Sequence, residues 1–187
     1  RNMIADLKPY LAMKDSGVEW CGDVPEHWSL IPNRNLFRIR KVLVGSRHKE
    51  YQLLSLTKGG VIVRDMSTGK GKFSEFWERS QEVRPGDLVF CLLDVDETPR
   101  TVGLSPHPGM ISGDYTVMEC FDSASAIFLE RFYIAMDDRK LLKPIYTGLR
   151  KRISKPLLLA AKTPIPPPSE QAAIVKYIRE ATADIDT

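Results

Sequence analysis

Most features that mark membrane proteins, secreted proteins and metalloproteins are missing from this sequence. None of its apolar runs approaches the roughly twenty residues that a membrane helix needs. Its three cysteines form no close pair, which fits reduced thiols better than a disulfide framework. Its three histidines are scattered, without the spacing of metal ligands. We therefore expect a soluble, cytoplasmic protein with no membrane contact and no metal site.

Motifs for nucleotide and methyl-group chemistry are also absent. The sequence contains no Gly-x-Gly-x-x-Gly fingerprint and no Asn-Pro-Pro-Tyr motif of adenine methylases. The stretch 64–73 combines glycine, hydroxyl residues and lysines, which suits contact with a phosphate backbone, but it has no Walker spacing. A solvated loop is the alternative there. We expect no catalytic residue and no cofactor in this chain.

The positive charge of the chain is small overall but locally concentrated. The formal net charge of +3 over 187 residues is too small to indicate a nucleic-acid-binding protein by itself. Between residues 139 and 162, however, there is no acidic residue. Such a local excess suits a surface that faces nucleic acid, although a solvated basic face is the alternative. The basic residues of this stretch are Arg139, Lys140, Lys143, Arg150, Lys151, Arg152, Lys155 and Lys162.

The pattern of apolar residues predicts one domain that contains both strands and helices. The length suffices for one well-filled core. The continuous apolar run within 83–93 predicts a strand that is buried on both faces at the centre of the sheet. Trp20 and Trp28 are expected to anchor an irregular N-terminal arm. We expect a hairpin of strands over 51–56 and 61–63, further strands over 101–104 and 115–121, and helices over 33–41 and 126–142.

Certain basic side chains are the candidates for contact with DNA. Arginine offers a planar fork that can bind guanine N7 and O6 together, whereas lysine serves phosphates as a point charge. The sharpest candidate is the run of three basic residues after the glycine turn in 146–154. The candidate base readers are Arg64, Arg100, Arg150 and Arg152, and the candidate phosphate contacts are Lys58, Lys70, Lys72 and Lys151.

A proline-rich stretch leads into a predicted helix near the end of the sequence. Pro164, Pro166, Pro167 and Pro168 fix φ and supply no amide donors, so we expect an extended segment there. Ser169 suits the N-cap of the helix that follows. Apolar residues at heptad spacing then form a stripe suited to a partner helix, although packing on its own domain is the alternative. The stripe and its flanks comprise Gln171, Ile174, Val175, Ile178, Ala181, Thr182 and Ile185.

Five segments in a fixed order resemble the specificity subunits of type I restriction-modification enzymes. Residues 14–28, Lys-Asp-Ser-Gly-Val-Glu-Trp-Cys-Gly-Asp-Val-Pro-Glu-His-Trp, resemble the opening motif of that family, with Cys21 where leucine is usual. Residues 164–178, Pro-Ile-Pro-Pro-Pro-Ser-Glu-Gln-Ala-Ala-Ile-Val-Lys-Tyr-Ile, resemble the segment that closes a target recognition domain. Between them, Leu53-Leu-Ser-Leu56, Pro85-Gly-Asp-Leu-Val-Phe90 and Ile111-Ser-Gly-Asp-Tyr115 match core motifs of the family in order and spacing.

The resemblance implies an α/β fold of the α+β type, with a mixed, twisted β-sheet and flanking helices, followed by a coiled-coil-type spacer helix. It also implies a division of the chain and a set of partners. It implies a target recognition domain over 1–163, which reads one half of a bipartite target in double-stranded DNA, and the start of a conserved spacer helix over 164–187. The chain would recognise rather than catalyse, and would direct modification (methyltransferase) and restriction subunits, with S-adenosylmethionine bound by the modification subunit. A second recognition domain and a second spacer helix are missing, so we expect a fragment or a half-length subunit. A half-length subunit could form a homodimer through Ile174, Val175, Ile178 and Ile185.

Two other functions remain open from the sequence. The cluster of Asp94, Asp96 and Glu97 could belong to a small metal-dependent nuclease, although an acidic loop after a strand is the simpler interpretation. A protein-interaction adaptor with incidental basic loops is the other alternative. The nuclease would cleave DNA in the presence of magnesium, whereas the adaptor would show no salt-sensitive DNA binding.

Overall fold

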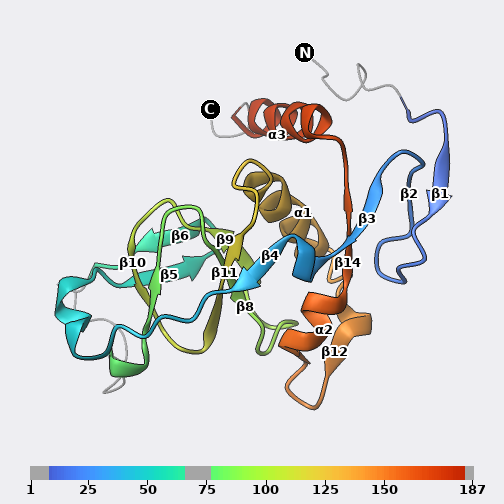
Figure 1. Ribbon diagram of the computed structural model, residues 1–187. Helices are drawn as coiled ribbons and strands as arrows, with labels where there is room; N and C mark the ends of the chain where they lie inside the picture. The colour runs from blue at the N-terminus through green and yellow to red at the C-terminus, as the bar shows by residue number, and fades with distance from the viewer. Residues whose placement is uncertain (1–8, 66–76, 184–187) are drawn as a thin grey trace.

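A four-stranded antiparallel sheet lies at the centre of the fold, with its strands in the order β4-β11-β8-β9 (Figure 1). The computed structural model describes residues 9–65 and 77–183. The sheet comprises β4 (Phe37–Ile39), β11 (Tyr115–Cys120), β8 (Leu88–Cys91) and β9 (Val102–Leu104). The predicted α+β class is confirmed. The expected mixture of strand directions is not found, because every ladder between the described strands is antiparallel and a single isolated parallel bridge joins Leu53 to Met110.

The central strand β8 separates two apolar cores. Leu88 and Phe90 belong to the larger core, whereas Val89 belongs to the smaller one. Alternate side chains of a strand point to opposite faces, and all three residues are fully buried. The predicted central strand that is buried on both faces is therefore confirmed. On the larger-core face, α1 (Ala126–Asp138) packs against the sheet through Leu129.

Two short hairpin-like ladders cover the other face of the sheet. The strands β5 (Leu54–Thr57) and β6 (Gly60–Val63) form the predicted hairpin, and β7 (Gln81–Val83) pairs with β10 (Gly109–Ile111). The hairpin lies so close to β9 that a Cβ at Gly103 would stand 2.6 Å from Leu56 Cδ1. Glycine at this position therefore permits the close approach of the two layers.

The predicted helices are partly wrong. Residues 33–41 form one 3-10 turn, η2 (Asn33–Asn35), followed by the strand β4. The apolar residues Phe37 and Ile39 fit a strand as well as a helix, and pairing with β11 decides between the two. Helix α1 begins as predicted but ends at Asp138, because Lys140 adopts a φ of 51° and interrupts the helical backbone.

A buried polar network joins three segments that lie far apart in the sequence. The Asn33 side-chain amide donates to the Tyr133 hydroxyl at 2.6 Å and to the Leu158 carbonyl at 2.7 Å. Thr163 Oγ1 donates to Asn33 Oδ1 at 2.6 Å. Burial raises the pKa of Tyr133 to about 12, so this hydroxyl stays protonated. Every member of the network has a partner, which makes its burial tolerable.

The two ends of the described chain lie side by side. The strand β3 (Ser29–Pro32) pairs with β14 (Lys162–Ile165), which leads into α3 (Pro168–Ala183) above α1 (Figure 1). The short strands β1 (Met13–Asp15) and β2 (Asp23–Pro25) form the arm beside β3. The proline-rich segment is extended as predicted, except that Pro168 begins the helix. Proline is tolerated in a first helical turn, where its missing N–H has no intrahelical partner.

The proposed division into 1–163 and 164–187 stays a prediction. Its boundary falls inside β14, which is hydrogen-bonded along its length to β3. Trp20 is buried in the larger core, as expected of an anchor, and Trp28 is half-buried. Within residues 9–65 and 77–183, no helix is both long enough and apolar enough to cross a membrane.

Candidate nucleic-acid interface

The run of three basic residues lies on a hairpin that projects from the lower edge of the molecule in Figure 1. Its strands are β12 (Tyr146–Thr147) and β13 (Arg152–Ile153), and α2 (Lys155–Ala160) follows it. Gly148 has a φ of +70° and Lys151 a φ of +43°, and Lys151 N–H donates to the Gly148 carbonyl at 3.2 Å. The glycine turn expected from the sequence therefore brings Arg150, Lys151 and Arg152 to the tip of a tight hairpin.

The segment that follows β8 supports this hairpin through its backbone. Ile153 N–H donates to the Leu92 carbonyl at 3.1 Å. In the opposite direction, Asp94 N–H donates to the Arg150 carbonyl at 3.1 Å, and Val95 N–H donates to the Lys151 carbonyl at 3.3 Å. The basic hairpin is thus held in place by hydrogen bonds to a segment attached directly to the central sheet.

Carboxylates of the same segment pair with the basic side chains. Arg150 donates to Asp94 Oδ2 at 3.0 Å, and Lys151 pairs with Asp96. Lys143 lies 3.7 Å from the second oxygen of Asp96. The hydrogen bond from Lys151 lowers the pKa of the Asp96 carboxyl. The acidic cluster therefore acts as the counterion of the basic hairpin.

This pairing is unlike a metal centre. Two of the three carboxylates proposed for the nuclease alternative, those of Asp94 and Asp96, are directed at basic side chains. Across residues 9–65 and 77–183, no group of three or more His, Cys, Asp or Glu residues has a metal-binding arrangement. The interpretation as an acidic loop after a strand fits this geometry better.

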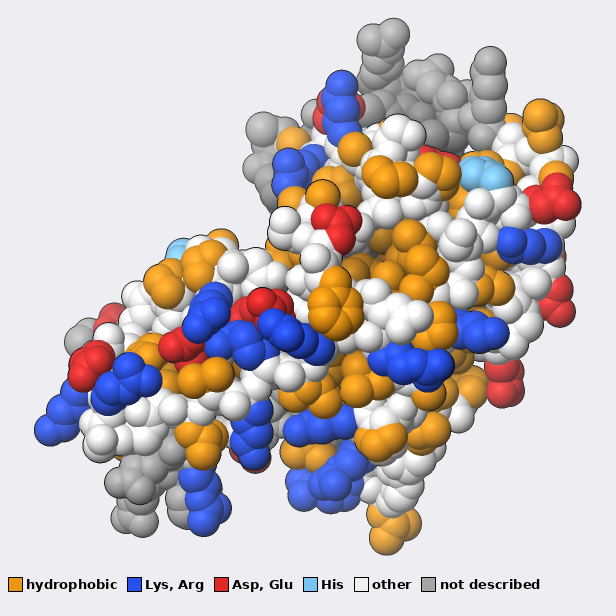
Figure 2. Space-filling view, viewed as in Figure 1, with side chains coloured by type: hydrophobic (Ala, Val, Ile, Leu, Met, Phe, Trp, Pro, Cys, Tyr) orange, Lys and Arg blue, Asp and Glu red, His pale blue; other side chains and the backbone are white. Residues whose placement is uncertain are grey.

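Basic side chains outnumber the paired carboxylates at the hairpin. Arg152 is exposed, and none of the ion pairs formed within the described residues includes it. Figure 2 shows Lys and Arg side chains along the lower border of the visible face, near the position of this hairpin in Figure 1. An exposed guanidinium beside paired ones gives this edge a positive charge that can bind an anion.

A cavity of about 540 Å³ brings several predicted residues together. It is lined by Arg64 and Trp77, which flank the undescribed stretch 66–76, and by Asp94 and Arg150 from the hairpin region. Tyr115, from the motif Ile111-Ser-Gly-Asp-Tyr115, also lines it. Burial raises the pKa of the Tyr115 hydroxyl, which therefore remains a neutral hydrogen-bonding group. Two of the predicted base readers thus share one concave surface.

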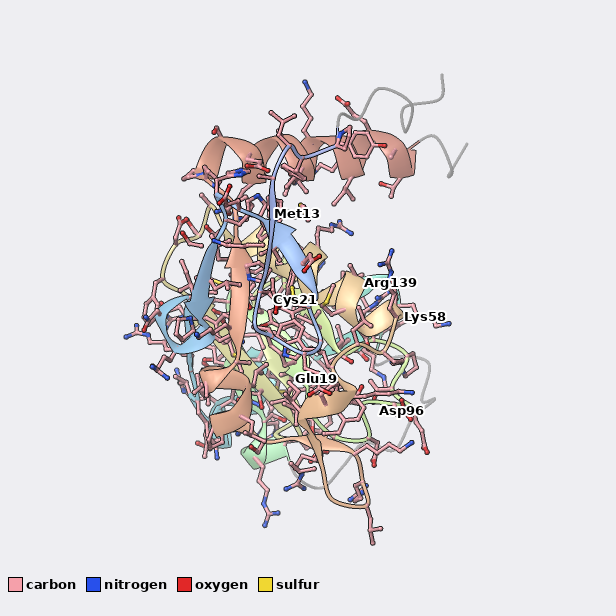
Figure 3. All side chains as sticks on the ribbon, turned by 90° about the vertical axis from the view of Figure 1, so that its right-hand side faces the viewer. Met13, Glu19, Cys21, Lys58, Asp96 and Arg139 are labelled. Atoms are coloured by element: carbon pink, nitrogen blue, oxygen red, sulfur yellow. The ribbon has the colours of Figure 1, made fainter. Side chains whose placement is uncertain are left out.

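The other predicted DNA contacts lie elsewhere. Arg100 is largely buried and donates to Asp138 Oδ1 at 2.8 Å. Lys58 is exposed in the β5–β6 turn, and Figure 3 shows its side chain on the same side of the molecule as those of Asp96 and Arg139. Lys70 and Lys72 lie outside the described residues. The structure therefore places Arg64 and Arg150 in one cavity and Lys151 and Arg152 on the same hairpin as Arg150, whereas Arg100 is paired with helix α1.

The predicted partner stripe is only partly open. Ile174, Val175 and Ile178 are each half-buried on α3. Val175 and Gln171 face a groove of about 490 Å³ that is also lined by Ile127 of α1. The stripe therefore faces its own domain in part, which matches the alternative of ordinary helix packing. Ile185 lies outside the described residues.

Two residues of the site region carry roles that sequence patterns did not reveal. Asp87, within the motif Pro85-Gly-Asp-Leu-Val-Phe90, accepts from Arg40 Nη2 at 2.7 Å and from Arg84 N–H at 2.8 Å. It stabilises the fold rather than facing a ligand. Leu149, at the hairpin tip, is an exposed apolar residue between Gly148 and Arg150. An apolar residue inside a predicted turn is the sequence feature that could have pointed to Leu149.

Comparison with solved structures identifies the fold of the chain. The chain has the fold of the HsdS subunit of type I restriction-modification systems. The crystal structure of the HsdS subunit from Thermoanaerobacter tengcongensis matches 93% of this chain with a TM-score of 0.54 and 15% sequence identity. A structure that describes complex assembly and conformational transition of the type I R-M system matches 98% with a TM-score of 0.60 and 16% identity.

The chain corresponds to only part of these neighbours. It covers 41% of the first matched chain and 43% of the second. In sequence, no family model matches it, and no curated protein matches it either. At 15% and 16% identity the matched structures define the fold of this chain. The resemblance in sequence motifs is therefore confirmed at the level of the fold.

Proposed function

We propose that this chain recognises double-stranded DNA as one target recognition domain of a type I specificity subunit. The observation that carries this proposal is the supported basic hairpin Tyr146–Ile153, beside a cavity that contains Arg64 and Tyr115. The fold shared with the HsdS subunit supports it. The chain covers less than half of each matched structure, which fits one recognition domain and half of a bipartite target.

The ion pairs of the hairpin suit an exchange of partners. Arg150 is 70% exposed and Asp94 is 39% exposed in their pair. Pairs of this kind contribute only about 0–1 kcal/mol to stability. A DNA phosphate can therefore replace Asp94 as the partner of Arg150 at little cost to the fold. Arg152, which pairs with no carboxylate in the described part of the chain, is our first choice for contact with a guanine edge.

Partners and cofactor follow from the same proposal. The chain would contribute recognition, while a modification subunit would bind S-adenosylmethionine and transfer the methyl group, and a restriction subunit would cleave. The exposed side of α3 would extend toward these subunits or toward a second copy of the chain. A cytoplasmic location, where the DNA target lies, completes the proposal.

The first test is selection from random duplex DNA by this chain, alone and together with a modification subunit. We expect enrichment of a short motif, with an affinity that falls steeply as salt rises because neutralised phosphates release counterions. Association of the two proteins without enriched sequence would favour the adaptor instead. Cleavage of DNA by the chain alone in magnesium would favour the nuclease.

A matched pair of variants localises the interface. Arg150→Gln and Arg38→Gln each remove one arginine from an exposed ion pair of nearly equal exposure, Arg150–Asp94 or Arg38–Glu119. We expect Arg150→Gln to weaken binding and to reduce the slope of log affinity against log salt by about 1. Arg38→Gln should leave both unchanged. Equal losses from the two variants would show that the hairpin is not the interface.

A further inference from the structure

The tip of the basic hairpin carries an apolar side chain with no contact to the fold that would bury it. Leu149 is 103% exposed, so it contributes no burial to the stability of this domain. A turn with Gly148 at positive φ has no need of an apolar residue at the next position. Its presence at the outermost point of the hairpin is therefore unexplained by packing.

The hairpin holds this side chain in a fixed position. The backbone that follows Leu149, from Arg150 to Ile153, is tied to the segment Leu92–Val95 by three hydrogen bonds between 3.1 and 3.3 Å. Thr147 Oγ1 donates across the hairpin to the Arg152 carbonyl at 3.1 Å. A side chain presented on such a support loses little conformational freedom when it is inserted into a partner.

The charges around the tip indicate the nature of that partner. Arg150, Lys151 and Arg152 follow Leu149 directly in the sequence. The buried centre of a protein–protein interface is depleted of charged residues. An apolar side chain followed by cations instead resembles the way DNA-bending proteins combine phosphate contacts with an apolar wedge between base pairs.

We propose that Leu149 inserts between two adjacent base pairs of the bound DNA and partly unstacks that step. This inference rests on the proposed function and adds a residue that contributes to specificity. Pyrimidine–purine steps unstack most easily, so the wedge would favour such a step at one position of the half-site without any hydrogen bond to a base. The cations beside it would hold the phosphates that flank the opened step.

The experiment uses the 187-residue chain with its modification subunit and the half-site found by selection. The adenine analogue 2-aminopurine, whose emission rises when it is unstacked, replaces each adenine in turn. Apart from the target adenine, which a modification subunit flips out of the stack, we expect a strong rise at one further step with the unmodified chain, and its loss with Leu149→Ala. Leu149→Met keeps a long apolar side chain and should retain the signal. We expect Leu149→Ala to bind about tenfold more weakly, the effect of 1.4 kcal/mol.

Leu11 provides the control, because it is equally exposed but stands in a stretch without consecutive basic residues. Leu11→Ala should change neither the emission nor the affinity. Tight binding by the unmodified chain with no bright position other than the flipped target adenine would overturn the wedge but leave the proposed function intact. Loss of association with the modification subunit in Leu149→Ala would overturn it too, because Leu149 would then be a protein contact. Absence of DNA binding by the unmodified chain would instead contradict the proposed function.

Discussion

Two arginine–aspartate pairs, one inside the molecule and one at its edge, use the same chemistry for different ends. Arg40 donates to Asp87 at 2.7 Å, and the two side chains are only 9% and 5% exposed. Arg150 donates to Asp94 at 3.0 Å with most of its side chain in solvent. Arg40 also donates to Glu82, both to its carboxylate at 2.9 Å and to its carbonyl at 3.0 Å. The buried pair is thus part of a side-chain network, whereas the side chains of Arg150 and Asp94 form no other ion pair within the described residues.

The difference in burial determines what each pair can do. Breaking a buried pair leaves an uncompensated charge, whereas an exposed pair exchanges its partner for water at little cost. Arg40 therefore cannot be released to a ligand without destabilising the fold, but Arg150 can. Arginines of this chain have to be sorted by the exposure of their counterions before any of them is assigned to DNA.

The largest effect is expected from Arg40→Met. It would leave the buried Asp87 carboxylate with the Arg84 N–H as its remaining donor and would remove one of the two arginines paired with Glu82, at a cost of about 3–5 kcal/mol in the free energy of unfolding. Urea denaturation measures this loss. The exposed Arg38, two positions earlier, supplies the control Arg38→Met, for which we expect less than about 1 kcal/mol. Similar losses of unfolding free energy in Arg40→Met and Arg38→Met would contradict the expected difference between the buried and the exposed pair.

An intermediate effect on stability is expected at Glu170, at the start of α3. Partial burial alone would raise the pKa of its carboxyl, but hydrogen bonds donated by Tyr10, His27 and Trp28 outweigh burial and lower the pKa below its usual 4.5. The stabilisation is therefore present above pH 4.5 and is lost as the pH falls through the lowered pKa. We expect Glu170→Gln to destabilise the chain at pH 7 less than Arg40→Met does, and to flatten the fall in stability on acidification. Denaturation at a series of pH values gives the free energy of unfolding of the unmodified chain and of Glu170→Gln. An equal fall with decreasing pH in the two proteins would contradict this expectation.

The smallest effect on stability is expected for the exposed pair. Arg150→Gln and Asp94→Asn should each change the free energy of unfolding by less than about 1 kcal/mol. Their effects on DNA affinity should nevertheless differ in sign, because Asp94→Asn removes a competitor of the phosphate. Thermal denaturation and DNA titration of the same samples test both points. Weaker DNA binding by Asp94→Asn at unchanged stability would mean that Asp94 positions Arg150 for the DNA.

Elements with one dominant local signal could be predicted from the sequence, and elements decided by distant partners could not. The continuous apolar run around Phe90 predicted a buried strand correctly, because few other structures bury every side chain of so short a segment. The residues around Phe37 fitted a helix or a strand equally well. Their pairing with Cys120 and Met118 settled the choice, and no local pattern contains that information.

The candidate site shows the same limit. The glycine turn and the run of three basic residues after it could be predicted, since both the turn and the charge are local, but the strands β12 and β13 around the turn were not predicted. The counterions of Arg150 and Lys151 lie 56 and 55 residues earlier in the sequence, where they suggested a nuclease centre. Only the fold shows that these acids and bases neutralise each other, and that Arg100 is bound to α1 instead.

The pairing of β3 with β14 also constrains how the protein is made. Asn33 and Thr163, which are hydrogen-bonded beside this ladder, stand 130 residues apart. At the usual rate of translation, this separation corresponds to a delay on the order of 10 s. During that time β3 has an open edge, and neither Glu170 nor α3 is available to the arm that carries His27 and Trp28. The basic hairpin Tyr146–Ile153 is therefore synthesised before helix α3, which can dock on α1 only afterwards.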